Sequence, residues 1–124
     1  MSERAISLFR HESGANIVVV RGEHDLSTAD ELRDTLNQAL EAPTMIVDLS
    51  ETAFIDSAVL GVLIASQRAA VEAGRSWSLV IGGGSGAAVR RILELTGLHV
   101  MMPLYNSREE ALAAGSPSGS GMPG

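Results

Sequence analysis

The sequence contains no cysteine and few aromatic residues. None of its 124 residues is Cys, and Phe, Trp and Tyr together make up 3% of the chain. Without thiols the chain can form neither disulfides nor cysteine-based metal sites, and thiolate catalysis is excluded. The shortage of aromatic side chains also leaves no platform on which the bases of single-stranded nucleic acid could stack. The absence of cysteine favours a cytoplasmic location.

Basic residues and long apolar runs are scarce as well. Lys and Arg number 9 against 15 Asp and Glu, so the formal net charge is −6. Binding to a phosphate backbone needs a clustered basic surface, and here only Arg90 and Arg91 are adjacent, so we expect no direct contact with nucleic acid. No apolar run approaches the roughly 18 to 20 residues of a membrane span, and the first residues, MSERAISLFRHE, are charged. We therefore expect no membrane partner.

Signatures of enzyme chemistry are missing too. His11, His24 and His99 are dispersed, without the i, i+4 pairing to a second histidine or a carboxylate that is typical of metal sites. No G-x-S-x-G nucleophile elbow is present. The sequence therefore predicts a protein that is not an enzyme and that has no metal and no cofactor of its own.

Apolar periodicity predicts an alternation of strands and helices. The turn-like residues 12–16 separate the first two strands, which we expect to form a hairpin, and Thr28 with Glu31 predicts a capping box before the first helix. Ser107 with Glu110 predicts another before the last. Strands are predicted at 5–9, 17–20, 45–49, 77–81 and 100–102. Helices are predicted at 29–40, from Ser57 to Ala73, around 87–96, and from Ser107 to Ala114, with Gly74 and Gly97 ending two of them.

This alternation indicates an α/β fold. Helices between strands imply right-handed βαβ units with a partly parallel sheet, and the hairpin makes that sheet of four to five strands mixed. Residues 1–114 are expected to form a single domain. The remaining 115–124, GSPSGSGMPG, have the composition of a disordered tail.

The stretch FIDSAVLG, residues 54–61, joins an apolar strand to an apolar helix. It places Ser57 in the first turn of the helix, where free backbone N–H groups and the helix dipole favour a negative charge such as a phosphate. Asp56 and Ser57 are equally good helix N-caps, which a strand-to-helix junction needs whatever the protein does. The two interpretations are compatible, since a capping residue can also be a substrate.

Three blocks together resemble a known family. They are GEHDLSTADEL (Gly22–Leu32), VDLSETAFIDSAVLGVL (Val47–Leu63) and VRRILELTGL (Val89–Leu98). Because of the order and spacing of these blocks, the chain looks like a stand-alone STAS domain of the anti-sigma factor antagonists. The resemblance implies a mixed sheet with the helices packed mainly on one face. It also implies a partner, an anti-sigma factor that is a serine kinase, whose capture frees a sigma factor for transcription.

The resemblance further implies a switch at Ser57. The partner kinase would phosphorylate Ser57 and end the interaction, and a separate phosphatase would restore it. The partner-binding residues carried over from the family motifs are Asp25, Thr28, Asp56, Ala58, Val59 and Leu60. For Asp25 and Thr28 the plain alternatives are a turn former and a helix cap.

The chain departs from the family pattern beside the serine. Ala58 and Val59 replace the usual small polar residue and glycine, and Val59 either alters the docking surface or faces the core. His24 takes a place usually held by an aliphatic residue, and no role is assigned to it.

Two alternatives to an anti-sigma factor antagonist remain. The loop from Gly82 to Gly86, followed by Ala87, formally matches G-x-G-x-x-A, so it is either a flexible connector or a phosphate cradle of a nucleotide-binding or weak NTPase module. Arg90 and Arg91 are correspondingly either a phosphate clamp or part of a solvated helix face. A STAS subunit of a membrane transport complex is the second alternative.

Overall fold

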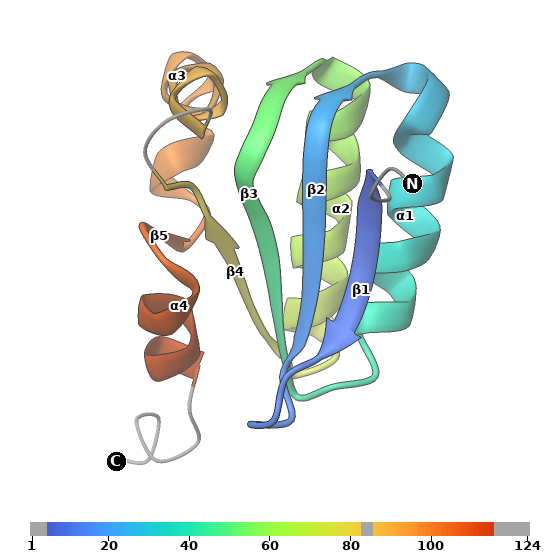
Figure 1. Ribbon diagram of the computed structural model, residues 1–124, viewed down its shortest axis with the longest axis vertical. Coiled ribbons are helices and arrows are strands. Elements are labelled where there is room, and N and C mark those ends of the chain that lie inside the picture. Colours follow the sequence, from blue (N-terminus) through green and yellow to red (C-terminus); the bar gives the residue numbers. More distant parts are fainter. Residues whose placement is uncertain (1–4, 83–85, 116–124) are drawn as a thin grey trace.

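The computed structural model describes residues 5–82 and 86–115, which form one mixed β-sheet with helices on both of its faces (Figure 1). The strands are β1 (Ile6–Arg10), β2 (Asn16–His24), β3 (Thr44–Ile55), β4 (Ser76–Val80) and β5 (Leu104–Tyr105). The helices are α1 (Leu26–Ala39), α2 (Ser57–Glu72), α3 (Gly86–Thr96) and α4 (Arg108–Gly115), with a single 3-10 turn, η1, at Leu98–Val100.

The strands lie in the sheet in sequence order. β1 is antiparallel to β2, and every later neighbour is parallel, which confirms the predicted α/β class and the mixed sheet. Because the chain always steps in the same direction across the sheet, right-handed crossovers place successive helices on the same face. The main core accordingly joins α1, α2 and α3 to that face, with Leu32, Leu63 and Leu93 fully buried.

Helix α4 covers the opposite face. Its Ala111 packs in a second, smaller core with β-sheet residues Ile17, Val19, Ile46 and Val80. Ser107 caps α4 by accepting the N–H of Glu110 at 3.1 Å, as the sequence predicted, while the Glu110 carboxylate accepts the N–H of Asn106. The prediction that helices pack mainly on one face is therefore confirmed, with α4 as the exception.

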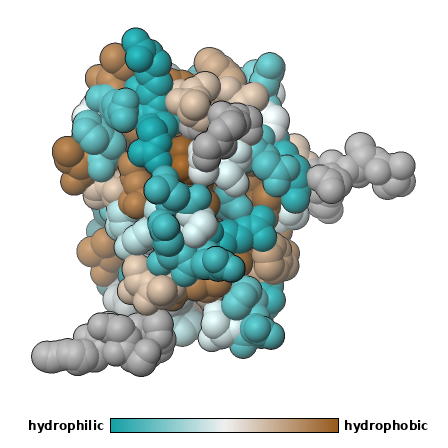
Figure 2. Space-filling model, turned by 60° about the vertical axis from the view of Figure 1, so that its left-hand side comes forward, coloured by the Kyte–Doolittle hydropathy of each residue, from teal (hydrophilic) through white to brown (hydrophobic). Residues whose placement is uncertain are grey.

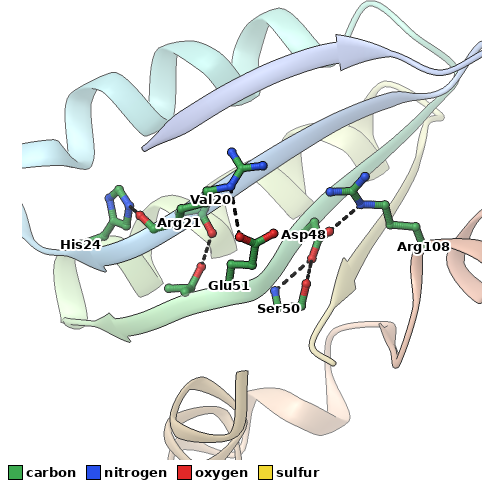
Figure 3. Close-up of polar contacts among 8 residues, drawn as sticks. Val20, Arg21, His24, Asp48, Ser50, Glu51 and Arg108 are labelled. Carbon is green, nitrogen blue, oxygen red and sulfur yellow. Dashed lines mark hydrogen bonds and ion pairs between the residues drawn. The ribbon is translucent and has the colours of Figure 1, made fainter. Parts of the chain in front are cut away.

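An ion pair ties α4 to the sheet. Arg108 Nε donates to Asp48 Oδ2 at 2.6 Å, and Asp48 Oδ1 accepts from both the N–H and the hydroxyl of Ser50 (Figure 3). The Arg108 guanidinium also lies 5.5 Å from the centre of the Phe9 ring. Because the Asp48 side chain is 4% exposed, this arginine compensates a buried charge.

The predicted last strand and the predicted cap of the first helix are wrong. The expected strand at 100–102 is instead η1 and the residues that follow it, because Gly97 turns the chain at a positive φ of 78° and leaves Val100 and Met101 on the surface. The true last strand, β5, begins after Pro103, whose carbonyl accepts the N–H of Leu79. The second error is the cap at Thr28, since α1 begins three residues before Ala29 and its N-cap is Asp25.

Both central strands are longer than predicted, and they bend before they end. Four residue steps along β2, from Val19 to Glu23, match six along β3, from Asp48 to Phe54, so β3 bulges twice against its neighbour. Between the two bulges the buried Thr52 hydroxyl donates to the Val20 carbonyl at 2.7 Å. Bulges re-aim the side chains that follow them, and here they precede the two helix N-termini described below.

Some sequence expectations lie outside the described residues, namely residues 116–124 of the predicted tail and residues 83–85 of the glycine loop. Within the described part of the chain, no helix combines the length and the apolar character needed to cross a bilayer.

Candidate functional site

The candidate site forms where β2 and β3 end side by side. The two strands are parallel, and His24 pairs with Ile55, so the residues that follow them, Asp25 and Asp56, lie next to each other. Each aspartate is the N-cap of the next helix, Asp25 for α1 and Asp56 for α2. Two helix N-termini therefore open at the same edge of the sheet.

Asp56 joins these two N-termini. Its Oδ1 accepts the N–H of Val59 in α2 at 3.0 Å, and its Oδ2 accepts the N–H of Leu26, the first residue of α1, at 3.1 Å. A single half-buried carboxylate thus satisfies one donor in each helix and sets the distance between them. The sequence predicted the cap on α2, whereas the bond to α1 is visible only in the tertiary structure.

Asp25 caps α1 from the exposed side. Its Oδ1 accepts both the N–H of Ser27 at 2.9 Å and the Ser27 hydroxyl at 2.6 Å. These bonds from Ser27, with a smaller contribution from neighbouring His24, lower the pKa of the Asp25 carboxyl below its ordinary value. Asp25 is therefore a turn-forming cap whose charge is held at the surface.

Ser57 is the first residue of α2 and is exposed. The preceding cap, Asp56, is half-buried, and the following Ala58 is likewise partly buried. The structure therefore places the Ser57 hydroxyl at the helix N-terminus, as the sequence predicted, where another protein can reach it.

Val59 and Leu60 face inward. Val59 is 1% exposed and packs in the main core, and Leu60 is 9% exposed. Of the two interpretations left open for Val59, the structure supports the core residue. Neither side chain is available to a partner on this surface, so any contact there is made by the residues around them.

Two exposed apolar side chains lie close to Asp25 and Asp56 in the chain, and the sequence reasoning did not single them out. Leu26 is 75% exposed immediately after Asp25, and Phe54 is 47% exposed two residues before Asp56. Phe54 pairs across the sheet with Glu23, in the bulged end of the strands. The signal that could have revealed Phe54 is its alternation with buried Ile55, which assigns it to the outer face of the strand.

Thr28 and His24 lie beneath this surface. Thr28 is in the first turn of α1, and its hydroxyl donates to the Asp25 carbonyl at 3.2 Å. The His24 ring is 1% exposed, and its Nδ1 lies 3.0 Å from the same hydroxyl. The structure thus brings together Asp25, Thr28, Asp56 and Ser57, with His24 as an additional buried neighbour.

A hollow of about 460 Å³ lies at the carboxyl end of β4. Arg90 lines it but does not have the predicted solvated position, because it donates to the Ile81 carbonyl and to Asn106 Oδ1. Arg91 is exposed, as a solvated face requires. A Cβ on Gly82 would meet the Asn106 carbonyl oxygen and the Ser50 Cβ at 3.3 Å, so close packing alone accounts for that glycine.

Figure 2 views the molecule from the side of α3 and α4. Hydrophilic residues run down the middle of this face, and hydrophobic residues form separate groups beside them.

No three His, Asp or Glu side chains in the described part of the chain gather in a metal-binding arrangement.

Comparison with known proteins assigns this chain to a family. The family model described as "Mlab, STAS domain" matches residues 7–104. The chain belongs to the STAS domain family. This confirms the resemblance read from the three sequence blocks.

The chain is also similar to individual proteins of known description. An "Anti-sigma F factor antagonist" of Paenibacillus polymyxa is 28% identical over 105 residues, which are 82% of this chain and 87% of the relative. A crystal structure of an anti-sigma factor antagonist from Mycobacterium paratuberculosis is 30% identical with a TM-score of 0.79, covering 89% of this chain and 92% of that one. A sulfate transporter family protein of Wolinella succinogenes, 18% identical with a TM-score of 0.67 over 80% and 82% of the two chains, shares the fold.

Proposed function

We propose that this STAS protein is an anti-sigma factor antagonist that acts in the cytoplasm as a binding protein, not as an enzyme. It captures an anti-sigma factor with serine kinase activity, frees a sigma factor, and is switched off by phosphorylation of Ser57. The observation that supports this most directly is the exposed Ser57 at the N-terminus of α2, which Asp56 joins to the N-terminus of α1. The relatives described as antagonists support the same role.

The docking surface consists of the exposed residues around Ser57. Leu26 and Phe54 supply apolar contact area, and exposed large apolar side chains of this kind mark protein interfaces when they cluster. Asp25 adds a negative charge at their rim. We infer that Thr28, Asp56, Val59 and Leu60 support this surface from below and that Ala58 contributes at its edge.

Phosphorylation would change this surface without unfolding the protein. A phosphoserine brings roughly −1.5 to −2 charges, and a helix N-terminus accommodates an anion. In the complex the same group would be buried beside the Asp56 carboxylate, and a buried charge without a partner costs several kcal/mol. A loss of about 3 to 4 kcal/mol weakens binding by two to three powers of ten. A phosphatase that removes the group would restore binding.

The test combines the protein with candidate kinase-type anti-sigma factors, ATP and Mg²⁺. We expect one phosphate per chain at Ser57 by mass spectrometry and none in Ser57→Ala. Ser57→Asp should bind the partner roughly 100-fold to 1,000-fold more weakly than the unphosphorylated wild-type protein does, measured by calorimetry. Ser13 is an exposed serine in the turn between β1 and β2, at the opposite end of the sheet, so Ser13→Asp is the matched control and should bind normally.

Unchanged affinity in Ser57→Asp would contradict the electrostatic switch. Phosphate found at another serine while Ser57 stays unmodified would contradict the assignment of the site.

The hollow at the carboxyl end of β4 favours one second candidate, a nucleotide-binding or weak NTPase module. Its lining includes Gly82, Arg90 and Arg91, and parallel sheets bind ligands at this edge. Saturable ATP or GTP binding that is lost in Arg91→Gln, with normal folding, would support it. A role as the STAS subunit of a transport complex has no comparable support from the site.

A further inference from the structure

Strand β1 leaves one edge of the sheet open. It is the first strand in the sheet order and pairs with β2, and the described part of the chain has no strand on its other side (Figure 1). The opposite edge strand, β5, has only two residues. Native sheets usually blunt an exposed edge strand with a proline, a central charge or a bulge. The sequence of β1, ISLFR, has no proline, carries its charge on the last residue, and pairs with β2 in unbroken register.

The hydrogen bonds beside β1 determine which of its backbone groups face the open edge. The N–H of Arg21 donates to the Ala5 carbonyl at 2.7 Å, just before β1 begins. In an antiparallel pair, positions that are bonded to the neighbouring strand alternate with positions that are not. The odd-numbered residues of β1 are therefore bonded to β2, and the even-numbered residues direct their N–H and C=O groups to the open edge. These outward residues are Ile6, Leu8 and Arg10.

A second β1 strand can bind all of these outward groups at once. Antiparallel strands exchange two backbone hydrogen bonds at every bonded pair of residues. When Leu8 of two copies pair with each other, Ile6 of each copy lies opposite Arg10 of the other, and every outward group of both strands has a partner. A shift of the register in either direction leaves outward groups unpaired. The strand is therefore complementary to itself about a two-fold axis at Leu8.

We propose that β1 is a homodimer interface, through which two copies of this chain join their sheets edge to edge. On the face covered by α4, this pairing covers an exposed aromatic ring. Phe9 is 40% exposed, lies under Arg108 of α4, and comes opposite Ser7 of the other copy. The two Phe9 rings become diagonal neighbours, which aromatic side chains can bridge. The docking surface around Ser57 lies at the ends of β2 and β3, so the two proposals are tested independently.

The opposite face of β1 borders an open groove. The Arg10 side chain is on this face, because its Nε donates to Asn16, which in turn donates to the Ala39 carbonyl of α1. The groove, of about 270 Å³, lies between β1 and α1 and is lined by Ile6, Ser7, Leu8, Thr35 and Gln38.

Charge complementarity favours a second copy as the occupant of this groove. Glu31 lies one helical turn before Thr35, on the same stripe of α1. Arg10 of the other copy lies opposite Ile6 and extends into the groove toward Glu31. The two-fold axis repeats this pairing of opposite charges, so each copy contributes one cation and one carboxylate.

Helix α1 leaves room for its own copy. It packs over β1 and β2, and neighbouring strands are about 4.8 Å apart, so the axes of the two α1 helices are about 10 Å apart in the dimer. Helices pack at about this distance. The residues of α1 that line the groove, Thr35 and Gln38, are uncharged and do not repel their copies.

Sedimentation velocity of the full chain at about 5 to 500 µM should show a reversible dimer. Arg10→Glu should weaken self-association roughly tenfold, because it places like charges together at both symmetric positions. Adding Glu31→Arg should restore the dimer, which also shows that the variants fold. Arg33→Glu is the matched control, since it changes the net charge equally at an exposed surface pair with Asp30 and should dimerise normally. A wild-type protein that stays monomeric, or equal weakening by the two charge reversals, would overturn the proposal.

Cross-linking tests the register, because the chain has no cysteine of its own. In the dimer, Ser7 lies opposite Phe9 of the other copy at a Cα separation of about 4.5 Å, within the range of a disulfide. Identical residues are diagonal neighbours, about 7 to 8 Å apart, which is too far. An oxidised mixture of Ser7→Cys and Phe9→Cys proteins should therefore form disulfide-linked heterodimers, and neither variant alone should cross-link. Equal cross-linking of the single variants would show that the strands do not pair in this way.

Discussion

At the residue scale, Asp56 determines the geometry of the candidate site. The sequence predicts a cap at this position because Asp follows a strand and precedes an apolar helix. The cap alone does not explain the arrangement, since the second carboxylate oxygen binds the N–H of Leu26 in a different helix. Ser57 is presented beside α1 because one side chain holds both N-termini.

Replacing Asp56 should therefore cost more than the loss of an ordinary cap. We expect Asp56→Ala to lower the free energy of unfolding by about 2 kcal/mol, because one donor in each helix loses a charged acceptor. Denaturant unfolding measures this. Asp30→Ala is the control, since Asp30 pairs with Arg33 on the surface with its side chain 91% exposed, and it should change stability by less than about 0.5 kcal/mol. Equal losses in the two variants would contradict the bridging role.

At the element scale, helix α4 differs from the other helices because it covers the second face of the sheet. Its capping box was readable from Ser107 and Glu110, but nothing in the local pattern indicates which face it covers. Arg108 attaches α4 to this second face of the sheet, because its side chain binds Asp48 on β3, sixty residues earlier in the chain. An ion pair of that sequence separation cannot be found from periodicity.

Removing Arg108 should loosen α4 measurably. We expect Arg108→Met to lower the free energy of unfolding by about 2 to 3 kcal/mol, because Asp48 stays buried and keeps the bonds from Ser50 but loses its cation. Arg33→Met, at a surface pair, should have an effect near zero. Restoring part of the loss with Asp48→Asn in the Arg108→Met background would identify the uncompensated charge as the cause. No recovery would point to lost packing on Phe9 instead.

At the scale of the whole molecule, the sheet order explains why a short chain can display one compact site. The parallel strands β2 and β3 end at the same edge, so the two family blocks that contain these strand ends are brought together there. The second face needs α4 to bury Ile17, Val19, Ile46 and Val80. The fold therefore extends to the end of α4.

Truncation tests where the folded unit ends. A chain ending at Gly115 should melt within about 1 °C of the full-length protein, because the Gly/Ser/Pro-rich residues beyond it have little apolar surface to bury. A chain ending at Asn106, which lacks α4, should lose about 3 kcal/mol or more, since it exposes the second core and leaves Asp48 unpaired. A large loss in the first variant would show that the domain extends beyond residue 115.

The sequence by itself determined most elements of this protein, the order of its strands and helices, the family blocks and the place of Ser57 at a helix N-terminus. These depend on local properties, namely apolar periodicity, capping residues and the glycines that end helices. Only the tertiary structure decided that Val59 belongs to the core, that Leu26 and Phe54 are exposed, and that the buried His24 lies against Thr28. The physical reason is that burial and long-range hydrogen bonds depend on which segments meet, and sequence spacing does not specify that.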